Sequence, residues 1–544
     1  MSTAVAPGRP GAADAAGRVA GPARVASPAL DTGDPHKYII ALAVVLASVM
    51  QVIDSSIVNV AIPHMMGNFG ASIDEIAWVS TAYILASVIV IPMTGWLAGF
   101  FGRKRYFVTS ILIFTAASFF CGASGSLGVL VFWRVVQGIG GGALIATSQA
   151  ILYESFPRRE AGTAMALFGV GIMVGPTIGP TLGGWITDNF SWPWIFYINL
   201  PIGILAAVMI AAYVHDSAHQ AKSRTIDFIG IALLTVSVGA LQYLLEHGER
   251  DGWFDSPLMM ALAAVSLIGG VLLVWRELTV EEPVIDFRVL RHREMWVGVV
   301  IGVVFGVALL GSVFVLPVFL QNMLHMTAEQ TGLVLLPGAL ATAVTMGTSS
   351  KLTRNIDARL VVTVGAVFFF YSMVRLSHLT AESGQYDFFW PLIWRGFGLG
   401  LMFVPLTNIT LADLSPKEMP QGTALYNFFR TLGGSFGIAL MATLLTRFTA
   451  QAKAILAEHV GVTDPIALER VGAMTRAFIG KGADPNTAHA MALRAIDGQL
   501  AVQASVIAFG RVYYLSGLIL LACVPLLLLV RKTKPAGKVE MHLE

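Results

Sequence analysis

The chain has 544 residues, of which 56% are hydrophobic and only 12% are charged, and its formal net charge is +2. Soluble domains carry about 25% charged residues, so this composition and a mean hydropathy of +0.72 exclude a soluble globular protein. They predict a protein that crosses a membrane many times.

Fourteen apolar runs are close to the roughly 20 residues that an α-helix needs to cross a bilayer. The sequence therefore predicts an all-α polytopic membrane protein. The runs are 38–63, 76–100, 106–123, 127–153, 161–186, 194–214, 228–245, 257–275, 295–320, 331–350, 360–376, 388–411, 423–445 and 512–530.

The orientation follows from the lysines and arginines of the short loops, which are enriched on the cytoplasmic side. They lie in alternate loops, with Arg250 as the exception. These loops are predicted to be cytoplasmic, with both termini inside, and the basic residues are read as topology signals rather than as a nucleic-acid patch. They are Arg103, Lys104, Arg105, Arg158, Arg159, Lys222, Arg224, Arg288, Arg291, Arg293, Lys351, Arg354 and Arg359.

An internal repeat indicates two similar halves. Phe-Trp-Arg134 in the fourth predicted helix is echoed by Ile-Trp-Arg395 in the twelfth. Paired bundles around a midplane cavity are the architecture of rocking transporters. The predicted organisation is a disordered cytoplasmic tail (1–37), a six-helix bundle (38–215), two inserted helices (226–276), a second six-helix bundle (295–531) and a cytoplasmic tail (532–544).

The segment 447–505, between the last two helices, is predicted to be an extramembrane loop with two or three short helices. It is either a tolerated insertion or a docking surface. The two cysteines, Cys121 and Cys523, lie in apolar runs, so neither a disulfide framework nor a metal site is expected.

Small residues recur every fourth position in the fifth predicted helix: Gly171, Gly175, Gly179 and Gly183. This spacing clears one helix face of side chains, so that a neighbouring helix can approach closely. Between these glycines lie Pro176 and Pro180, which remove backbone donors and loosen the helix, and Gly184 follows them. The run is either a bendable element or a tightly packed structural helix.

Few ionisable residues fall deep within the predicted helices, and Asp54 is the only acid among them. A charge in hydrocarbon faces a cavity or a partner. Asp54 and Arg134 are expected at the same depth, where a proton could compete with the arginine for the carboxylate; a permanent structural ion pair is the alternative. The candidate cavity residues are Asn59, Tyr83, Gln137, Arg395, Asn427 and Arg430.

Five motifs resemble the major facilitator superfamily, and specifically its fourteen-helix drug:proton antiporters of the EmrB and QacA kind. They are the first-helix motif 53–63, the loop motif 95–105 with Gly95, Gly102 and Arg103, the fourth-helix motif 134–140, the antiporter motif 171–184 and the segment 192–203. The loop motif departs from the family at Gly99 and Phe100, where an acid and an arginine are usual.

The absence of an acid in 331–350 and the long loop before the last helix favour the EmrB type. The resemblance implies a multidrug efflux pump of the bacterial inner membrane that has no cofactor and uses the proton gradient. In this reading Asp54 carries the proton and Arg134 tunes its release. It further implies a tripartite system with a periplasmic adaptor of the EmrA type and an outer-membrane channel of the TolC type.

Three other functions remain open to different degrees. A dedicated exporter of an endogenous metabolite, such as a fatty acid or siderophore, would use the same machinery. A sensor with this fold would form no substrate gradient. An intramembrane enzyme is disfavoured because only one buried acid is predicted, whereas catalysis needs converging groups at one depth.

Overall fold

The computed structural model describes residue 3 and residues 34–157, 160–216, 225–353, 355–458, 460 and 465–530. These residues form helices, turns and loops, and none of them is in a strand. Most of the tail 1–37, all of the tail 532–544, and the loop residues Arg158, Arg159, Lys222, Arg224 and Arg354 lie outside the described residues.

Within the described residues, fourteen helical spans are long and apolar enough to cross a membrane, as predicted. The first bundle contains α1 (Lys37–Phe69), α2 (Ile73–Val90), η1 (Ile91–Met93), α3 (Thr94–Phe101), α4 (Arg103–Gly122), α5 (Leu127–Gly141), α6 (Leu144–Ser155), α7 (Ala161–Asn189), α8 (Trp194–Tyr197) and α9 (Asn199–Tyr213). The inserted pair is α10 (Phe228–His247) and α11 (Pro257–Thr279), joined through η3 (Trp253–Asp255).

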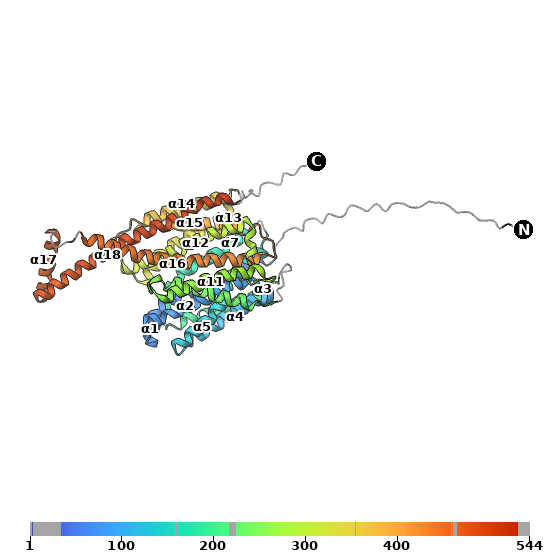
Figure 1. Cartoon of the computed structure of the whole chain (residues 1–544), viewed down its shortest axis with the longest axis horizontal. Coiled ribbons are helices and arrows are strands. Elements are labelled where there is room, and N and C mark those ends of the chain that lie inside the picture. Colours follow the sequence, from blue (N-terminus) through green and yellow to red (C-terminus); the bar gives the residue numbers. More distant parts are fainter. Residues whose placement is uncertain are drawn as a thin grey trace.

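The second bundle follows η4 (Phe287–Arg291). It contains α12 (Arg293–Asn322), α13 (Ala328–Leu352), α14 (Ala358–Leu376), α15 (Gln385–Leu411), α16 (Met419–Glu458) and α18 (Pro485–Ala522), which continues into η5 (Val524–Leu529). We call the end of the bundles that carries Lys37, Arg103 and Arg293 the basic end. The other end, from which α17 (Pro465–Gly480) projects, is the opposite end (Figure 1).

Two spans of the first bundle are interrupted for identifiable local reasons. Pro92 lies in η1, between α2 and α3, and cannot donate a backbone hydrogen bond. Gly142 separates α5 from α6, and a Cβ there would lie 2.6 Å from the Ser87 carbonyl oxygen. The missing side chain thus lets the junction of α5 and α6 lie directly against α2.

The glycine stripe of α7 faces α1, which confirms that a neighbour uses the bare face. A Cβ on Gly171 or Gly175 would lie 2.6 Å from a methyl carbon of Val45 or Val52, and one on Gly179 would collide with the Ser56 hydroxyl. α7 is continuous through Pro176 and Pro180. The stripe therefore sets how closely α1 and α7 can pack.

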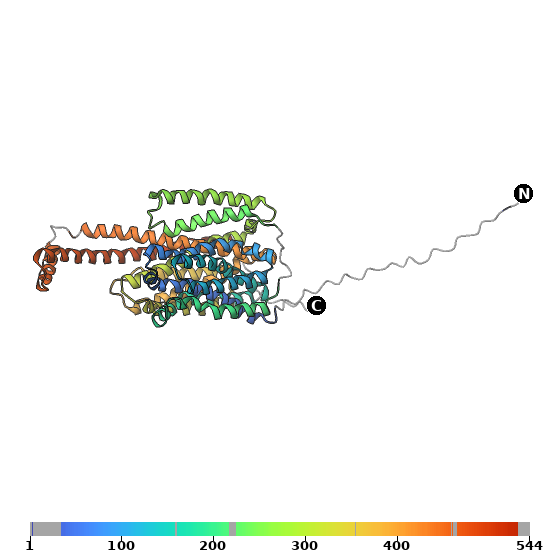
Figure 2. The same cartoon turned by 90° about the horizontal axis from the view of Figure 1, so that it is seen from below.

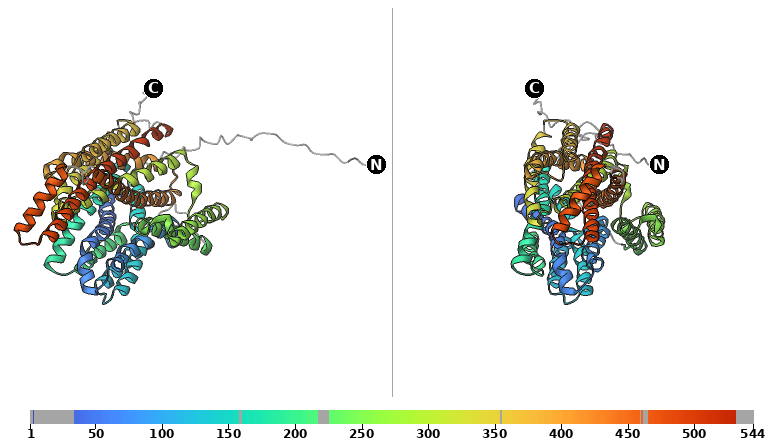
Figure 3. Two further views of the ribbon diagram at one scale, coloured as in Figure 1. Left: turned by 60° about the vertical axis from the view of Figure 1, so that its left-hand side comes forward. Right: turned by 90° about the vertical axis from the view of Figure 1, so that its left-hand side faces the viewer.

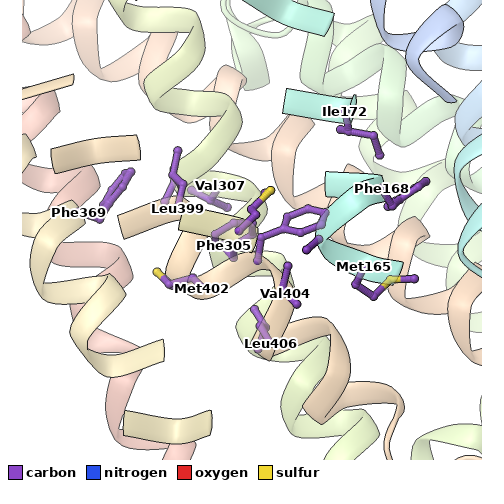
Figure 4. Close-up of a cluster of buried hydrophobic side chains, with 14 of the residues drawn as sticks. Met165, Phe168, Ile172, Phe305, Val307, Phe369, Leu399, Met402, Val404 and Leu406 are labelled. Carbon is purple, nitrogen blue, oxygen red and sulfur yellow. The ribbon is translucent and has the colours of Figure 1, made fainter. Parts of the chain in front are cut away.

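The two bundles meet at the basic end. Tyr153 Oη donates to Asn408 Oδ1 at 2.6 Å, and Asn427 Nδ2 donates to Gln149 Oε1 at 2.5 Å. Apolar packing extends this contact, since one buried cluster includes Phe168 of α7 together with side chains of α12 and α15. Figure 4 shows Met165, Phe168 and Ile172 of α7 opposite Phe305, Val404 and Leu406.

The inserted pair lies at the edge of the molecule, where α10 and α11 pack on each other (Figures 2 and 3). At the basic end Arg276 Nη2 donates to Asp227 Oδ1 at 3.0 Å, and this hydrogen bond lowers the pKa of Asp227. At the opposite end Thr81 of α2 donates to Glu246, and the Trp253 ring nitrogen donates to Thr443 of α16 at 3.0 Å. The pair thus contacts both bundles at the opposite end.

The prediction of two or three short helices in 447–505 is wrong in its main point. α16 continues without a break for 40 residues and α18 for 38, so each is roughly 60 Å long, about twice the hydrocarbon thickness. Among the described residues of this segment, α17, with 16 residues, is the one separate short helix (Figure 1). Helical hydrogen bonding carries both spans past their apolar runs, and the two extensions project as a hairpin.

The α1–α7 contact generates a stability prediction. Gly179→Val places three carbons against Ser56 and Ile57 of α1, and overpacking of this kind destabilises by about 1–3 kcal/mol. The expected result is a lower thermal unfolding midpoint in detergent, measured by tryptophan fluorescence. The matched control is Gly184→Ala, whose Cβ meets only Val60 at 3.8 Å, and which leaves the midpoint unchanged. Equal midpoints for both variants would contradict a steric role for the stripe.

Candidate functional site

The carboxylate of Asp54 lies in the interior of the first bundle, with an exposed fraction of 0%. Arg134 Nη1 of α5 donates to Oδ2 at 2.7 Å. Gln137 Nε2, one turn further along α5, and Asn199 Nδ2 of α9 each donate to Oδ1 at 2.8 Å. A buried charge is tolerated when it is paired and hydrogen-bonded, and here one cation and two amides meet that requirement.

The arginine is itself fixed by groups on three sides. Its Nε donates to the Val79 carbonyl oxygen of α2 at 2.9 Å, and its Nη1 also donates to Gln137 Oε1 at 2.8 Å. The guanidinium carbon lies 4.3 Å from the centre of the Tyr83 ring, which is a favourable cation–π geometry. Arg134 is 1% exposed, so solvent does not compete for these contacts.

Asn199 is held in turn by α4. Its Nδ2 also donates to Ser118 Oγ at 3.0 Å, and Ser118 Oγ donates to the Phe196 carbonyl oxygen at 2.8 Å. The network therefore joins α1, α2, α4, α5 and α9 around one carboxylate. Loss of the negative charge on Asp54 would weaken its contacts to both α5 and α9.

The structure brings together four of the residues singled out from sequence: Asp54, Arg134, Gln137 and Tyr83. The predicted Asp54–Arg134 contact is confirmed, and its role in proton transfer stays a prediction. The direct contact of Asn199 with Asp54 was missed. The available signal was a lone amide inside the apolar run 194–214, within a segment already noted for its resemblance.

The other candidate cavity residues lie elsewhere. Asn59 is exposed on α1 and accepts a hydrogen bond from Ser80 at 3.3 Å. Asn427 is buried in the contact between the bundles, where it also accepts a hydrogen bond from Arg430 Nη2 at 2.7 Å. Arg395 is buried inside the second bundle.

The expectation that Asp54 is the only buried acid is wrong. Glu277 in α11 is 0% exposed and Glu294 in α12 is 5% exposed. Both lie beyond the ends of the predicted apolar runs, and the helices contain them because they continue past those runs. Asp54 remains distinct because it lies in the middle of its helix.

The loop motif makes its contacts in two directions. Gly102 has a φ of +86°, which favours glycine, and the next turn starts with Arg103 paired to Glu154 of the same bundle. Gly95 faces the second bundle, since a Cβ there would lie 2.9 Å from the side chain of Gln421. Gly95 therefore contacts the second bundle by close packing, and Arg103 forms an ion pair within the first bundle.

The buried network predicts strong coupling between Asp54 and Arg134. Arg134→Met leaves the carboxylate without its cation, and breaking one side of a buried pair destabilises by about 3–5 kcal/mol. The double variant Asp54→Asn with Arg134→Met removes both charges and should recover most of the thermal midpoint. A double-mutant cycle of thermal unfolding in detergent measures this, and additive single effects would contradict the coupling.

Comparisons with known proteins agree with this architecture. The family profile "Major Facilitator Superfamily" matches residues 44–438. The chain is 35% identical to the multidrug export protein EmrB of Escherichia coli (strain K12) over 430 residues, 78% of this chain and 84% of that protein. The same-named protein of Haemophilus influenzae is 36% identical over 434 residues, 79% and 84% of the two chains.

Two further relatives extend the comparison. The fatty acid resistance protein FarB of Neisseria gonorrhoeae is 32% identical over 422 residues, 77% of this chain and 83% of that protein. The crystal structure of the human organic anion transporter MFSD10 (TETRAN) superposes with a TM-score of 0.56 at 12% identity, covering 90% of this chain and 100% of that one, which shows the fold alone. This polytopic membrane protein is a transporter that belongs to the Major Facilitator Superfamily.

Proposed function

We propose that the protein exports hydrophobic or amphipathic drugs across the bacterial inner membrane in exchange for inward-moving protons. The observation that carries the proposal is the fully buried Asp54 carboxylate, held by Arg134, Gln137 and Asn199. Relatives at 35–36% identity are named as multidrug export proteins, which supports the drug class.

Protonation of Asp54 is the proposed coupling step. A neutral carboxyl group loses its charge–charge attraction to Arg134. Its hydroxyl also becomes a hydrogen-bond donor, although Arg134, Gln137 and Asn199 donate to the carboxylate in this structure. The tie between α1 and α5 weakens as a result. A coupled switch needs such a difference, because a ligand shifts an equilibrium only through unequal affinity for the two states.

The glycine stripe supports the movement that follows. α1 carries Asp54, and the neighbouring helix α7 presents Gly171, Gly175 and Gly179 to it. A face without side chains offers few interlocking contacts against sliding, and the prolines of α7 remove backbone hydrogen bonds that would stiffen it. We infer that α1 shifts against this surface as the bundles rock.

The basic end is proposed to face the cytoplasm, in keeping with the distribution of arginine and lysine. Tyr153 with Asn408 and Asn427 with Gln149 join the bundles at that end. In this orientation the structure has its cytoplasmic side closed, which is the state that releases drug outward and takes up a proton from outside.

The projecting hairpin is proposed to contact an adaptor protein of the EmrA type, which would connect the pump to an outer-membrane channel of the TolC type. Its surface carries large exposed apolar side chains, including Leu468 and Ile479 of α17 and Leu493 of α18. Such side chains outside the membrane mark protein contacts. A hairpin that extends both helices well beyond the bilayer favours this role over a tolerated insertion.

A dedicated exporter of fatty acids is the second candidate. It is favoured by the relative named as a fatty acid resistance protein, at 32% identity. The coupling machinery would be the same, and the two candidates differ only in the number of compounds accepted.

The first test follows protons in energised everted vesicles with a pH-sensitive dye while lipophilic compounds are added. Wild type should release internal acid on addition of several unrelated compounds, and Asp54→Asn should give only the background signal. The control Asp251→Asn, an exposed acid in the loop after α10, should behave as wild type. Transport by Asp54→Asn with an undiminished proton requirement would reject the assignment.

The second test separates docking from pumping. Leu468→Glu with Leu493→Glu should abolish drug resistance in cells and copurification of the adaptor, while proton release in vesicles stays at the wild-type level. Glu469→Gln, an exposed change on the same helix, serves as the control and should preserve both. Unchanged resistance and copurification in the double variant would show that the hairpin is not the docking surface.

A further inference from the structure

Arg395 is a buried cation in the second bundle, and no acid among the described residues pairs with it. Its exposed fraction is 7%, and its Nη1 is buried without a hydrogen-bond partner. Across the described part of the chain no ion pair or hydrogen bond to this side chain is recorded. Arg134, at the matching place in the first bundle, contacts Asp54, Gln137 and the Val79 carbonyl group.

The missing partner cannot be supplied by the helix that corresponds to α1. The sequence of α12 contains one acid, Glu294, at its basic end. Arg395 lies ten residues, roughly 15 Å, from the opposite end of α15, so Glu294 is roughly 25–30 Å away along the bundle. Asp387 is eight residues from Arg395 on the same helix and accepts a hydrogen bond from the Gly384 backbone.

Two further unpartnered polar groups lie on α18. Tyr513 is 1% exposed and close enough to Arg395 for an electrostatic interaction, and Ser516 is 2% exposed one turn further along the same face. The hydroxyl oxygens of both are buried without a hydrogen-bond partner. An unsatisfied buried polar group is costly. A guanidinium and two hydroxyl groups can all donate, so the group that would satisfy them is an acceptor with negative charge.

The surroundings specify the rest of the ligand. Three aromatic rings lie between Arg395 and the opposite end of the bundle. Phe509 of α18 packs edge-on against Phe319 of α12 with 5.0 Å between the ring centres, and the ring centre of Phe388 of α15 lies 6.2 Å from that of Phe319. All three rings are buried. A molecule that reaches Arg395 from that side must carry an apolar body past these rings, which have to turn aside to admit it. Because Arg395 supplies a single guanidinium group, the ligand that it would neutralise carries one negative charge.

We propose that Arg395, with Tyr513 and Ser516, binds the carboxylate of a lipophilic monoanion. The inference rests on the proposed transport function, because it names a substrate class for that pump. The carboxylate takes the place that Asp54 occupies beside Arg134 in the first bundle. Arginine and carboxylate form two parallel hydrogen bonds, among the strongest in proteins.

The test compares dodecanoate with its uncharged methyl ester on the purified full-length protein in nanodiscs at pH 7.5, with empty nanodiscs subtracted. Both probes compete with radiolabelled dodecanoate. Wild type should bind dodecanoate at least about tenfold more tightly than the ester, as expected for charge-assisted hydrogen bonds. Arg395→Gln should bring the ratio close to one, and Tyr513→Phe, which preserves ring volume, should reduce it.

The control variant is Arg375→Gln, which removes an exposed arginine from the last turn of α14 and should leave the ratio unchanged. As a second readout, dodecanoate should raise the thermal midpoint of wild type and of Arg375→Gln, and leave that of Arg395→Gln unaltered. A wild-type ratio near one would overturn the proposal. The proposal would also be overturned if Arg395→Gln and Tyr513→Phe both kept the wild-type preference for dodecanoate over the ester.

No proton gradient is present in this assay, so its outcome is independent of the antiport mechanism. Binding that depends on Arg395 would stand even if Asp54→Asn transported normally in vesicles. Conversely, failure of the dodecanoate preference would leave proton-coupled export of uncharged or cationic drugs intact.

Discussion

One negative charge buried in an apolar bundle constrains the rest of this protein. The carboxylate of Asp54 needs compensation that lipid cannot provide, and α5 and α9 supply it through Arg134, Gln137 and Asn199. Because these donors come from separate helices, the charge state of one side chain affects how the first bundle holds together. This makes a local proton-binding event a candidate cause of movement in whole helices.

The helix that carries Asp54 packs on another side against the bare surface of α7. Gly171, Gly175 and Gly179 let α7 approach α1 so closely that added side chains would collide. α1 thus lies between the hydrogen bonds of Asp54 and the close packing against α7. The hydrogen bonds depend on the charge of Asp54 and the packing does not, so protonation of Asp54 would change only the hydrogen bonds.

The two bundles are not equivalent, although their sequences repeat. In the first, the arginine of the fourth span is paired with an acid of the same bundle; in the second, Arg395 lies near the buried side chain of Tyr513. The inserted pair joins the bundles at the opposite end through Thr81 and Thr443. Contacts to both bundles give these two helices a physical role in addition to filling the edge of the fold.

Much of the architecture could be predicted because each span must bury its backbone polar groups in its own helix, so length and apolarity identify it without knowledge of its neighbours. The sequence by itself determined the fourteen spans, the bare face of α7 and the isolated charges Asp54, Arg134 and Arg395. It did not determine the ends of the helices, since hydrogen bonding carried α10, α16 and α18 past their apolar runs. Only the tertiary structure decided that Asn199 contacts Asp54, that Asn427 joins the bundles, and that no described residue pairs with Arg395, because these contacts depend on which helix faces are brought together from positions far apart in the chain.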